Sequence, residues 1–283
     1  MDAIKITADF ARSLLKPIAD DSHKGTFGHA LLVGGSYGKM GAVCLASEAA
    51  LRSGCGLATA YIPRCGYEII QTVVPEVMAI CDADYEFISR IESGISPQAI
   101  GIGPGMGQEP QTRKALFEYL SVVKSPIVID ADALNLLSSE TNWPTMLPPR
   151  SVLTPHKKEL ERLIGTWQSD SERIQKVSKI AVEKKAVFVL KGAPTRIVDE
   201  NSIYVNPTGN PALATGGTGD VLTGILTGFL AQRYEPVNAA ILAVYLHGRA
   251  ADLAIPEMGM RSFLARDILR YLPKAFLEIE SGF

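Results

Sequence analysis

Short, continuous apolar runs alternate with helix-forming segments along most of this chain. The clearest runs are residues 29–33 (HALLV), 57–62 (LATAYI), 99–103 (AIGIG) and 186–190 (AVFVL). A run of this length without polar alternation is typical of a strand that is buried on both faces. Strands of this kind, separated by helices, predict an α/β fold with a mostly parallel central sheet and helices on both of its faces.

The same pattern predicts further strands at residues 126–130 and 151–154. Two β-rich runs within residues 195–205 flank the polar segment 199–201 and indicate a hairpin. We expect this hairpin to add an antiparallel edge to the sheet, which would then be mixed. Helices are predicted at residues 40–53, 110–123, 131–139, 155–165, 170–184, 219–232, 236–254 and 264–279.

Length and charge exclude several classes of protein. The 283 residues carry 28 basic and 30 acidic side chains, so a general nucleic-acid binder, which needs a basic excess, is not expected. No linker or low-complexity tract divides the chain, and we expect one domain over residues 1–283. The first residues do not resemble a secretory signal, and no apolar run is long enough to span a bilayer. We therefore expect a cytoplasmic protein.

Glycine-rich or polar loops follow most of the predicted strands. In open α/β sheets, ligands bind beyond the carboxyl ends of the strands, so these loops are the candidate site. Glycine also lets the backbone approach a ligand closely. The loops are residues 34–42, 103–107, 130–135, 154–159, 191–195 and 206–220.

The last of these loops carries the strongest signal, because the sequence ATGGTGD leads into a helix. Its free backbone N–H groups and the helix dipole favour an anion such as phosphate. We expect an anion hole formed by Gly217, Thr218, Gly219 and Asp220. Asp220, at the helix start, should be stabilised in its ionised form and could accept a proton. The alternative is an ordinary aspartate cap on a tight turn.

Other strand-end residues allow two interpretations each. His156 could cap the helix that it opens, together with Glu159, or it could donate a hydrogen bond into a cleft. Lys191 could meet a phosphate or a nucleotide ring, or it could be an ordinary surface lysine. Asp130 and Asp132 could hold a divalent cation through water, or Asp132 could be a helix cap.

Three further features are less informative. The GPGMG loop does not match the dinucleotide-binding pattern G-x-G-x-x-G and is either a ligand-approaching loop or a structural turn. His247 lies within a predicted helix, where ordinary packing is the simpler interpretation. The chain has no Walker A motif, so phosphate binding of the P-loop type is not expected.

At these loops the chain resembles a known family. The segments HKGTFGHALLVGGS, GPGMG, DADALN, TPHKKE, KGAPT and NPTGNPALATGGTGD occur in the order found in the ADP/ATP-dependent NAD(P)H-hydrate dehydratases. These enzymes belong to the ribokinase-like superfamily, whose fold is a three-layer sandwich. The resemblance spans about residues 23–250. Met106 stands where this loop commonly has leucine. Some bacterial members carry a fused epimerase domain, which we do not expect in this chain.

The resemblance implies a lyase that repairs nucleotides. Its substrate would be the S form of hydrated NADH or NADPH (NADHX or NADPHX), and ADP (or ATP) would phosphorylate the added hydroxyl. Loss of phosphate would then restore NAD(P)H and leave AMP. The resemblance also implies Mg²⁺ on the diphosphate, a homotetramer, and a separate NAD(P)H-hydrate epimerase acting in the same pathway.

The resemblance also assigns residues. Asp220 would be the catalytic base. The hydrated dinucleotide would contact Ala42, Gly105, His156 and Asp220, and the nucleotide would contact Lys191, Gly192, Ala193, Pro194, Thr195 and Gly219. No side chain is assigned as a direct metal ligand. The alternatives are a kinase of the same superfamily acting on a thiazole or pyrimidine alcohol, an NAD-dependent oxidoreductase, and a nucleotide-binding module without catalysis.

Overall fold

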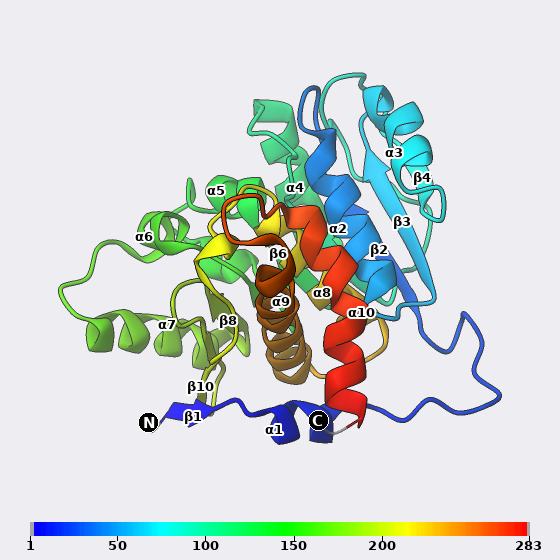
Figure 1. Cartoon of the computed structure of the whole chain (residues 1–283). Coiled ribbons are helices and arrows are strands. Elements are labelled where there is room, and N and C mark those ends of the chain that lie inside the picture. Colours follow the sequence, from blue (N-terminus) through cyan, green and yellow to red (C-terminus); the bar gives the residue numbers. More distant parts are fainter. Residues whose placement is uncertain (1–2, 282–283) are drawn as a thin grey trace.

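The computed structural model describes residues 3–281 and is built around one sheet (Figure 1). In the described residues the sheet has ten strands, in the order β1-β10-β9-β8-β7-β6-β5-β2-β3-β4. All neighbours are parallel except the two pairs that contain β9. The strands are β1 (Ala3–Lys5), β2 (His29–Val33), β3 (Leu57–Ile62), β4 (Met78–Cys81), β5 (Ala99–Ile102), β6 (Ile127–Ile129), β7 (Val152–Leu153), β8 (Val187–Leu190), β9 (Arg196–Val198) and β10 (Ile203–Val205).

Helices cover both faces of the sheet, as the apolar strands predicted. One face carries α1 (Ala8–Leu14), α2 (Met40–Arg52), α3 (Tyr67–Val73), α8 (Thr218–Ala231), α9 (Pro236–Met258) and α10 (Ala265–Ser281). The other carries α4 (Pro110–Val122), α5 (Ala131–Leu137), α6 (Lys157–Ile164) and α7 (Asp170–Lys184). The described residues also form three short 3₁₀ helices, at Arg64–Gly66, Trp143–Met146 and Pro211–Leu213.

The two hydrophobic cores lie on opposite faces of the sheet. On β2, the side chains of Ala30 and Leu32 belong to one core. Leu31 and Val33 belong to the other. Side chains alternate between the faces of a strand, so a strand covered on both faces needs a continuous apolar sequence. The absence of alternation that predicted these strands therefore has a direct structural cause.

The hairpin prediction is confirmed in part. β9 and β10 are antiparallel neighbours, with Ile203 opposite Val198. The expectation that this hairpin forms the edge of the sheet is wrong, because β1 pairs in parallel with β10 and lies outside it. All three residues of β1 are exposed, so this strand has no apolar run that the sequence could reveal. Helices α1 and α3 and strand β4 were also not predicted from the sequence.

The connections reverse direction between β2 and β5, which are neighbours in the sheet. From β2 the chain proceeds outward to β3 and β4, whereas from β5 it proceeds the other way to β6, β7 and β8. The loops that follow β2 and β5 therefore meet, and Gly35 N–H donates a hydrogen bond to the carbonyl of Pro104 over 2.8 Å. Such a reversal point is where open α/β sheets bind ligands.

Helix α8 lies within the molecule rather than on it. Of its 14 residues all but two are buried, and the two are Gly219 and Asp220 in its first turn. The helix packs directly on α2, because a Cβ atom on Gly224 would lie only 2.0 Å from the carbonyl oxygen of Ala46. Within residues 3–281 we find no helix with the length and apolar character that crossing a membrane requires.

We expect Gly224→Ala to lower the free energy of unfolding by about 2–3 kcal/mol, because the added methyl forces α8 away from α2. Urea denaturation measures the change. Gly41→Ala on α2 is the matched control: a Cβ there meets nothing within 4 Å. It should leave stability unchanged or raise it by about 0.5–1 kcal/mol through helix propensity. Equal effects of the two substitutions would contradict this close packing.

Candidate active site

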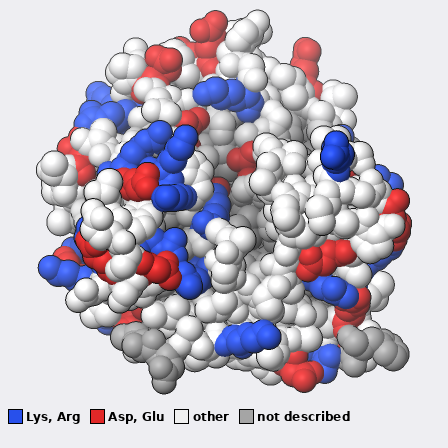
Figure 2. Space-filling view, turned by 60° about the vertical axis from the view of Figure 1, so that its left-hand side comes forward, with Lys and Arg blue, Asp and Glu red and all other residues white. Residues whose placement is uncertain are grey.

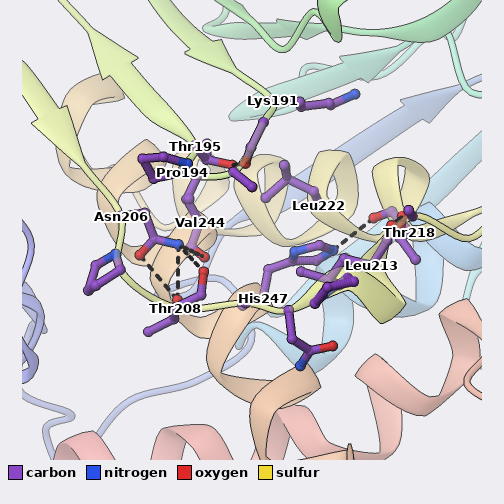
Figure 3. A pocket seen from close by; sticks show the side chains of 18 of the residues that line it. Lys191, Pro194, Thr195, Asn206, Thr208, Leu213, Thr218, Leu222, Val244 and His247 are labelled. Atoms are coloured by element: carbon purple, nitrogen blue, oxygen red, sulfur yellow. Dashed lines mark hydrogen bonds between the residues drawn. The ribbon is translucent and has the colours of Figure 1, made fainter. Parts of the chain in front are cut away.

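A cavity of about 670 Å³ opens at the carboxyl edge of the sheet (Figure 3). This volume is within the range of small-molecule sites. The cavity lies between the β8–β9 loop, the loop after β10, the start of α8, and α9. All six residues predicted to contact a nucleotide line it: Lys191, Gly192, Ala193, Pro194, Thr195 and Gly219.

The start of α8 has the geometry expected of an anion site. Gly217 is its N-cap residue, and its φ of 92° is in the left-handed region, which disfavours other residues. The helix begins at Thr218, so the first N–H groups of α8 have no intrahelical acceptor. Thr218 also lines the cavity, whereas Gly217 does not. Half of the predicted anion hole, Thr218 and Gly219, therefore borders the cavity directly.

Lys191 is held beside this helix start. Its Nζ lies 3.2 Å from the position that a Cβ atom on Gly219 would occupy. The same Nζ donates a hydrogen bond to Asp130 Oδ1 over 2.6 Å, and Thr223 Oγ1 donates to Asp130 Oδ2, also over 2.6 Å. Asp130 is 1% exposed. Lys191 is therefore an ion-paired residue at the cavity, and the surface-lysine alternative is wrong.

The two carboxylates considered for a cation have other partners. Asp130 is bound by Lys191 and Thr223, as described above. Asp132 accepts hydrogen bonds from Gly107 N–H and from the side chain of Gln108, each over 3.0 Å. Asp132 therefore holds the GPGMG loop, and the N-cap position of α5 is Asp130, not Asp132 as considered. Residues 3–281 contain no group of three or more acidic, His or Cys side chains placed to bind a metal ion.

Asp220 differs from expectation in its protonation. Burial raises the pKa of its carboxyl to about 7, the charge of Asp130 adds to this, and Lys191 offsets only part. The expectation that the helix start would keep Asp220 ionised is therefore wrong, because loss of water outweighs the helix dipole here. A carboxyl with this pKa is about half ionised at neutral pH and is a stronger base than an ordinary aspartate.

Two of the predicted substrate residues lie at the reversal point of the sheet. Ala42 is in the first turn of α2, and Gly105 is in the loop after β5. A Cβ atom on Gly105 would lie 3.0 Å from the Cβ of Ala42, so the two residues are neighbours. The carbonyl of Gly105 accepts a hydrogen bond from Ser36 Oγ over 2.8 Å, which fixes this loop on the loop after β2.

His156 caps α6, as one of its two interpretations proposed. Its Nδ1 accepts hydrogen bonds from the backbone N–H groups of Lys158 and Glu159, and Glu159 Oε2 accepts from the N–H of His156. With Nδ1 occupied as an acceptor, the ring proton of neutral His156 is on Nε2. Its side chain is 51% exposed, so a ligand can still reach the ring. Lys191 is close by, since its N–H donates to the carbonyl of Pro155.

The structure thus arranges the predicted residues in two groups. The nucleotide residues line the cavity, whereas Ala42, Gly105, His156 and Asp220 lie outside its lining. At the start of α8, Gly219 lines the cavity and Asp220 follows it directly. Figure 2 shows a hollow in one face of the molecule with basic side chains gathered along one side of it, although the net charge of the chain is only −2.

Within the loop after β10, residues 206–215 were not singled out from the sequence. Asn206 donates from Nδ2 to the carbonyl of Val244 over 3.3 Å, and Asp252 accepts from Gly209 N–H over 2.9 Å. These bonds tie the loop to α9. The turn-forming sequence NPTGNP at residues 206–211 was the one feature of the sequence that could have drawn attention to this part of the loop. His247 was interpreted as a packed residue, and it is packed, but it also lines the cavity.

The sequence model of the NAD(P)H-hydrate dehydratase family matches residues 30–274. The chain belongs to the NAD(P)H-hydrate dehydratase family. The resemblance drawn from the strand-end loops is thereby confirmed.

Relatives in this family are of two lengths. The ADP-dependent (S)-NAD(P)H-hydrate dehydratase of Bacillus subtilis is 34% identical, over 97% of this chain and 98% of that protein. A bifunctional NAD(P)H-hydrate repair enzyme of Moorella thermoacetica is 40% identical, over 97% of this chain but 54% of that protein. The chain spans about half the length of the bifunctional relatives that it matches.

Solved structures agree with the expected fold. The crystal structure of the B. subtilis ADP/ATP-dependent NAD(P)H-hydrate dehydratase, co-crystallised with ATP and Mg²⁺, has a TM-score of 0.87 at 34% identity and covers 99% of this chain and 100% of that one. A hydroxyethylthiazole kinase of Pyrococcus horikoshii shares the fold, with a TM-score of 0.60, at 16% identity and over 87% of each chain. The predicted ribokinase-like α/β fold is confirmed.

We expect Asp220→Asn to stabilise the protein in a pH-dependent way. Because the pKa of Asp220 rises from 3.8 to about 7 on folding, the folded state binds more protons between these values. The free energy of unfolding of the wild type therefore falls as pH rises from about 4 to 7. The asparagine variant has no carboxyl at this position, so its free energy of unfolding does not fall for this reason. The variant should be more stable above pH 7, by about 2–4 kcal/mol.

Urea denaturation from pH 4 to 8 tests this expectation. Asp9→Asn is the control, because Asp9 is also in the first turn of a helix but its side chain is 87% exposed. It should change the free energy of unfolding by less than about 1 kcal/mol across the series. A gap between wild type and Asp220→Asn that stays constant with pH would contradict the raised pKa.

Proposed function

We propose that this chain dehydrates the S form of hydrated NADH or NADPH at the expense of ADP, giving NAD(P)H, AMP and phosphate. The observation that carries the proposal is the junction at the start of α8. There a cavity lined by Lys191 and Gly219 meets the partly buried carboxyl of Asp220. The names and lengths of the dehydratase relatives support the same reaction.

The chemical problem is the leaving group. Hydroxide leaves poorly from the hydrated ring, whereas phosphate leaves well. Asp220 takes the proton of the ring hydroxyl while the hydroxyl oxygen attacks the β-phosphorus of ADP. The bond between the β-phosphorus and the bridging oxygen breaks, and AMP leaves with that oxygen. Phosphate then leaves with the electrons of its C–O bond, the neighbouring ring carbon loses a proton to water or to the departing phosphate, and the electrons of that C–H bond form the ring double bond. The pKa of about 7 makes Asp220 a base suited to this step near neutral pH.

The anion hole would act on the transferred phosphoryl group. Backbone N–H groups from Gly217 to Asp220 would stabilise its developing charge, with Lys191 beside them. We assign Lys191 to Thr195 and Gly219 to the nucleotide. We assign Ala42, Gly105 and His156 to the hydrated dinucleotide, and the reversal point of the sheet, where Ala42 and Gly105 adjoin, supports this assignment.

Magnesium would enter this site on the nucleotide. The carboxylates of Asp130 and Asp132 are occupied by hydrogen bonds, and the described residues offer no cage of three ligands. This donor set fits Mg²⁺, which keeps several waters and is bound mainly through substrate phosphates. When bound it would neutralise charge on the diphosphate.

Three wider statements belong to the same proposal. Residues 1–283 would form one dehydratase domain. The domain would assemble as a homotetramer, for which the exposed Leu264 and Leu277 at α10 offer apolar contact surface. An NAD(P)H-hydrate epimerase would act in the same pathway; the relatives named bifunctional repair enzymes are about twice as long as the part that this chain matches, which leaves room for a second activity.

Recovery of absorbance at 340 nm tests the reaction. We expect the enzyme, given hydrated NADH and ADP with Mg²⁺, to restore the absorbance of NADH and to release phosphate and AMP. Parallel reactions with ATP and with hydrated NADPH establish which of each pair is preferred. A stable phosphoester without recovery of NADH would indicate a kinase, and recovery without any nucleotide would exclude the proposed phosphoryl transfer.

The pH dependence of kcat/KM tests the role of Asp220. We expect kcat/KM to fall about tenfold per pH unit below pH 7 and to level off above it, because the free enzyme's base must be ionised. Asp220→Asn should lower kcat/KM by about 10²–10⁴-fold. The same variant should bind ADP nearly as tightly as the wild type in calorimetry. An active Asp220→Asn enzyme would refute the assignment of the base.

A further inference from the structure

His247 lies in the interior of α9 and is only 8% exposed, yet it lines the nucleotide cavity (Figure 3). At this point α9 passes the start of α8 and the loop after β10. The passage is close: a Cβ atom on the next residue, Gly248, would lie 2.4 Å from Thr208 Oγ1. The reaction proposed above gives this histidine no part.

The hydrogen bonding of the ring fixes its tautomer. His247 Nε2 lies 2.9 Å from the carbonyl oxygen of Thr218, the first residue of α8. A carbonyl oxygen can only accept, so Nε2 carries the proton. Burial lowers the pKa of His247 to about 4, so the ring is neutral at physiological pH and holds no second proton. Nδ1 therefore presents a lone pair.

This lone pair has no protein partner among residues 3–281. Figure 3 shows the second ring nitrogen on the side of the ring away from Thr218, toward the interior of the cavity. Leu213, Leu222 and Val244 line the same space. Nδ1 is not one of the fully buried polar atoms that lack a partner in the described residues, so it is open to the cavity. A ligand that donates a hydrogen bond there takes the place of water on this acceptor.

The ring is also held in place. Thr208 Oγ1 donates to the carbonyl of Tyr245 over 2.9 Å, and Asn206 Nδ2 donates to that of Val244. The turn of α9 before His247 is thus fixed to the cavity wall, and Thr218 fixes the far edge of the ring. Rotating the ring to exchange its nitrogens would break the bond to Thr218. Nδ1 is therefore an acceptor of fixed position.

We propose that Nδ1 of His247 accepts a hydrogen bond from the nucleoside part of the bound nucleotide and so helps to select it. The ligand chemistry is an N–H or O–H donor, supplied either by the exocyclic amine of adenine or by a ribose hydroxyl. Phosphate oxygens of ADP supply no such donor at neutral pH. The inference rests on the proposed function, which places ADP in this cavity.

Calorimetric titration with four ligands tests the proposal. These are ADP, 2′-deoxy-ADP, 3′-deoxy-ADP and inosine diphosphate, each with Mg²⁺. Inosine diphosphate has an oxygen in place of the exocyclic amine. We expect the wild type to bind one of the three analogues roughly 3- to 10-fold more weakly than ADP, as for one lost hydrogen bond. The analogue affected identifies the donor.

Substitutions of His247 complete the test. In His247→Phe the difference in affinity between ADP and the affected analogue should vanish, since no acceptor remains. In His247→Gln it should persist, because an amide can donate to Thr218 and accept from the ligand. His247→Leu replaces the Phe variant if that one does not fold, as judged by circular dichroism. Each variant is compared with the wild type on all four ligands.

Two results would overturn the inference. One is a wild type that binds all four ligands equally well. The other is an apolar variant that weakens all four by the same factor, which would mean that His247 acts only by holding Thr218. Both are distinct from failure of the proposed function, which would appear as a wild type that neither binds ADP nor consumes it in the absorbance assay.

Discussion

The buried carboxylate of Asp130 joins three segments that must meet for the site to exist. It follows β6, accepts from Lys191 at the end of β8, and accepts from Thr223 on α8. At 1% exposure an unpartnered carboxylate would cost several kcal/mol, so its two partners are effectively obligatory. Through them the sheet sets the position of α8, and with it the N–H groups that would meet a phosphate.

The same carboxylate shapes the chemistry of the site. Asp130 and the loss of water together raise the pKa of Asp220, and Lys191 lowers it. Asp220 and Gly219 are also the only residues of α8 that are not buried. A helix that is otherwise buried thus leaves part of its first turn open, at the residue that we propose as the base. The role proposed for Asp220 sets reactivity against stability, a conflict that is common at sites whose groups are perturbed for function.

The sequence predicted the parts of the fold that depend on burial. The strands at 29–33 and 57–62 have the predicted bounds, because both faces of each are covered. β1 escaped prediction because its pairing with β10 involves only backbone groups of three exposed residues. The loops of the site were predicted by their position after strands. The pKa of Asp220 was not, since it depends first on burial in the folded chain and then on the charge of Asp130, which is 90 positions away in the sequence.

The fold alone does not distinguish a dehydratase from a kinase. Up to the transfer of the phosphoryl group, both need a cavity for the nucleotide, an anion hole and a base, and α8 can provide the last two in either case. The reactions diverge afterwards, when a hydrated ring expels phosphate and an ordinary alcohol retains it. On the assignment proposed above, what separates them is the fit of the acceptor at the reversal point, where Gly105 adjoins Ala42. On that assignment the small residues at this point bear on the outcome of the reaction, whereas the phosphate-binding elements serve both reactions.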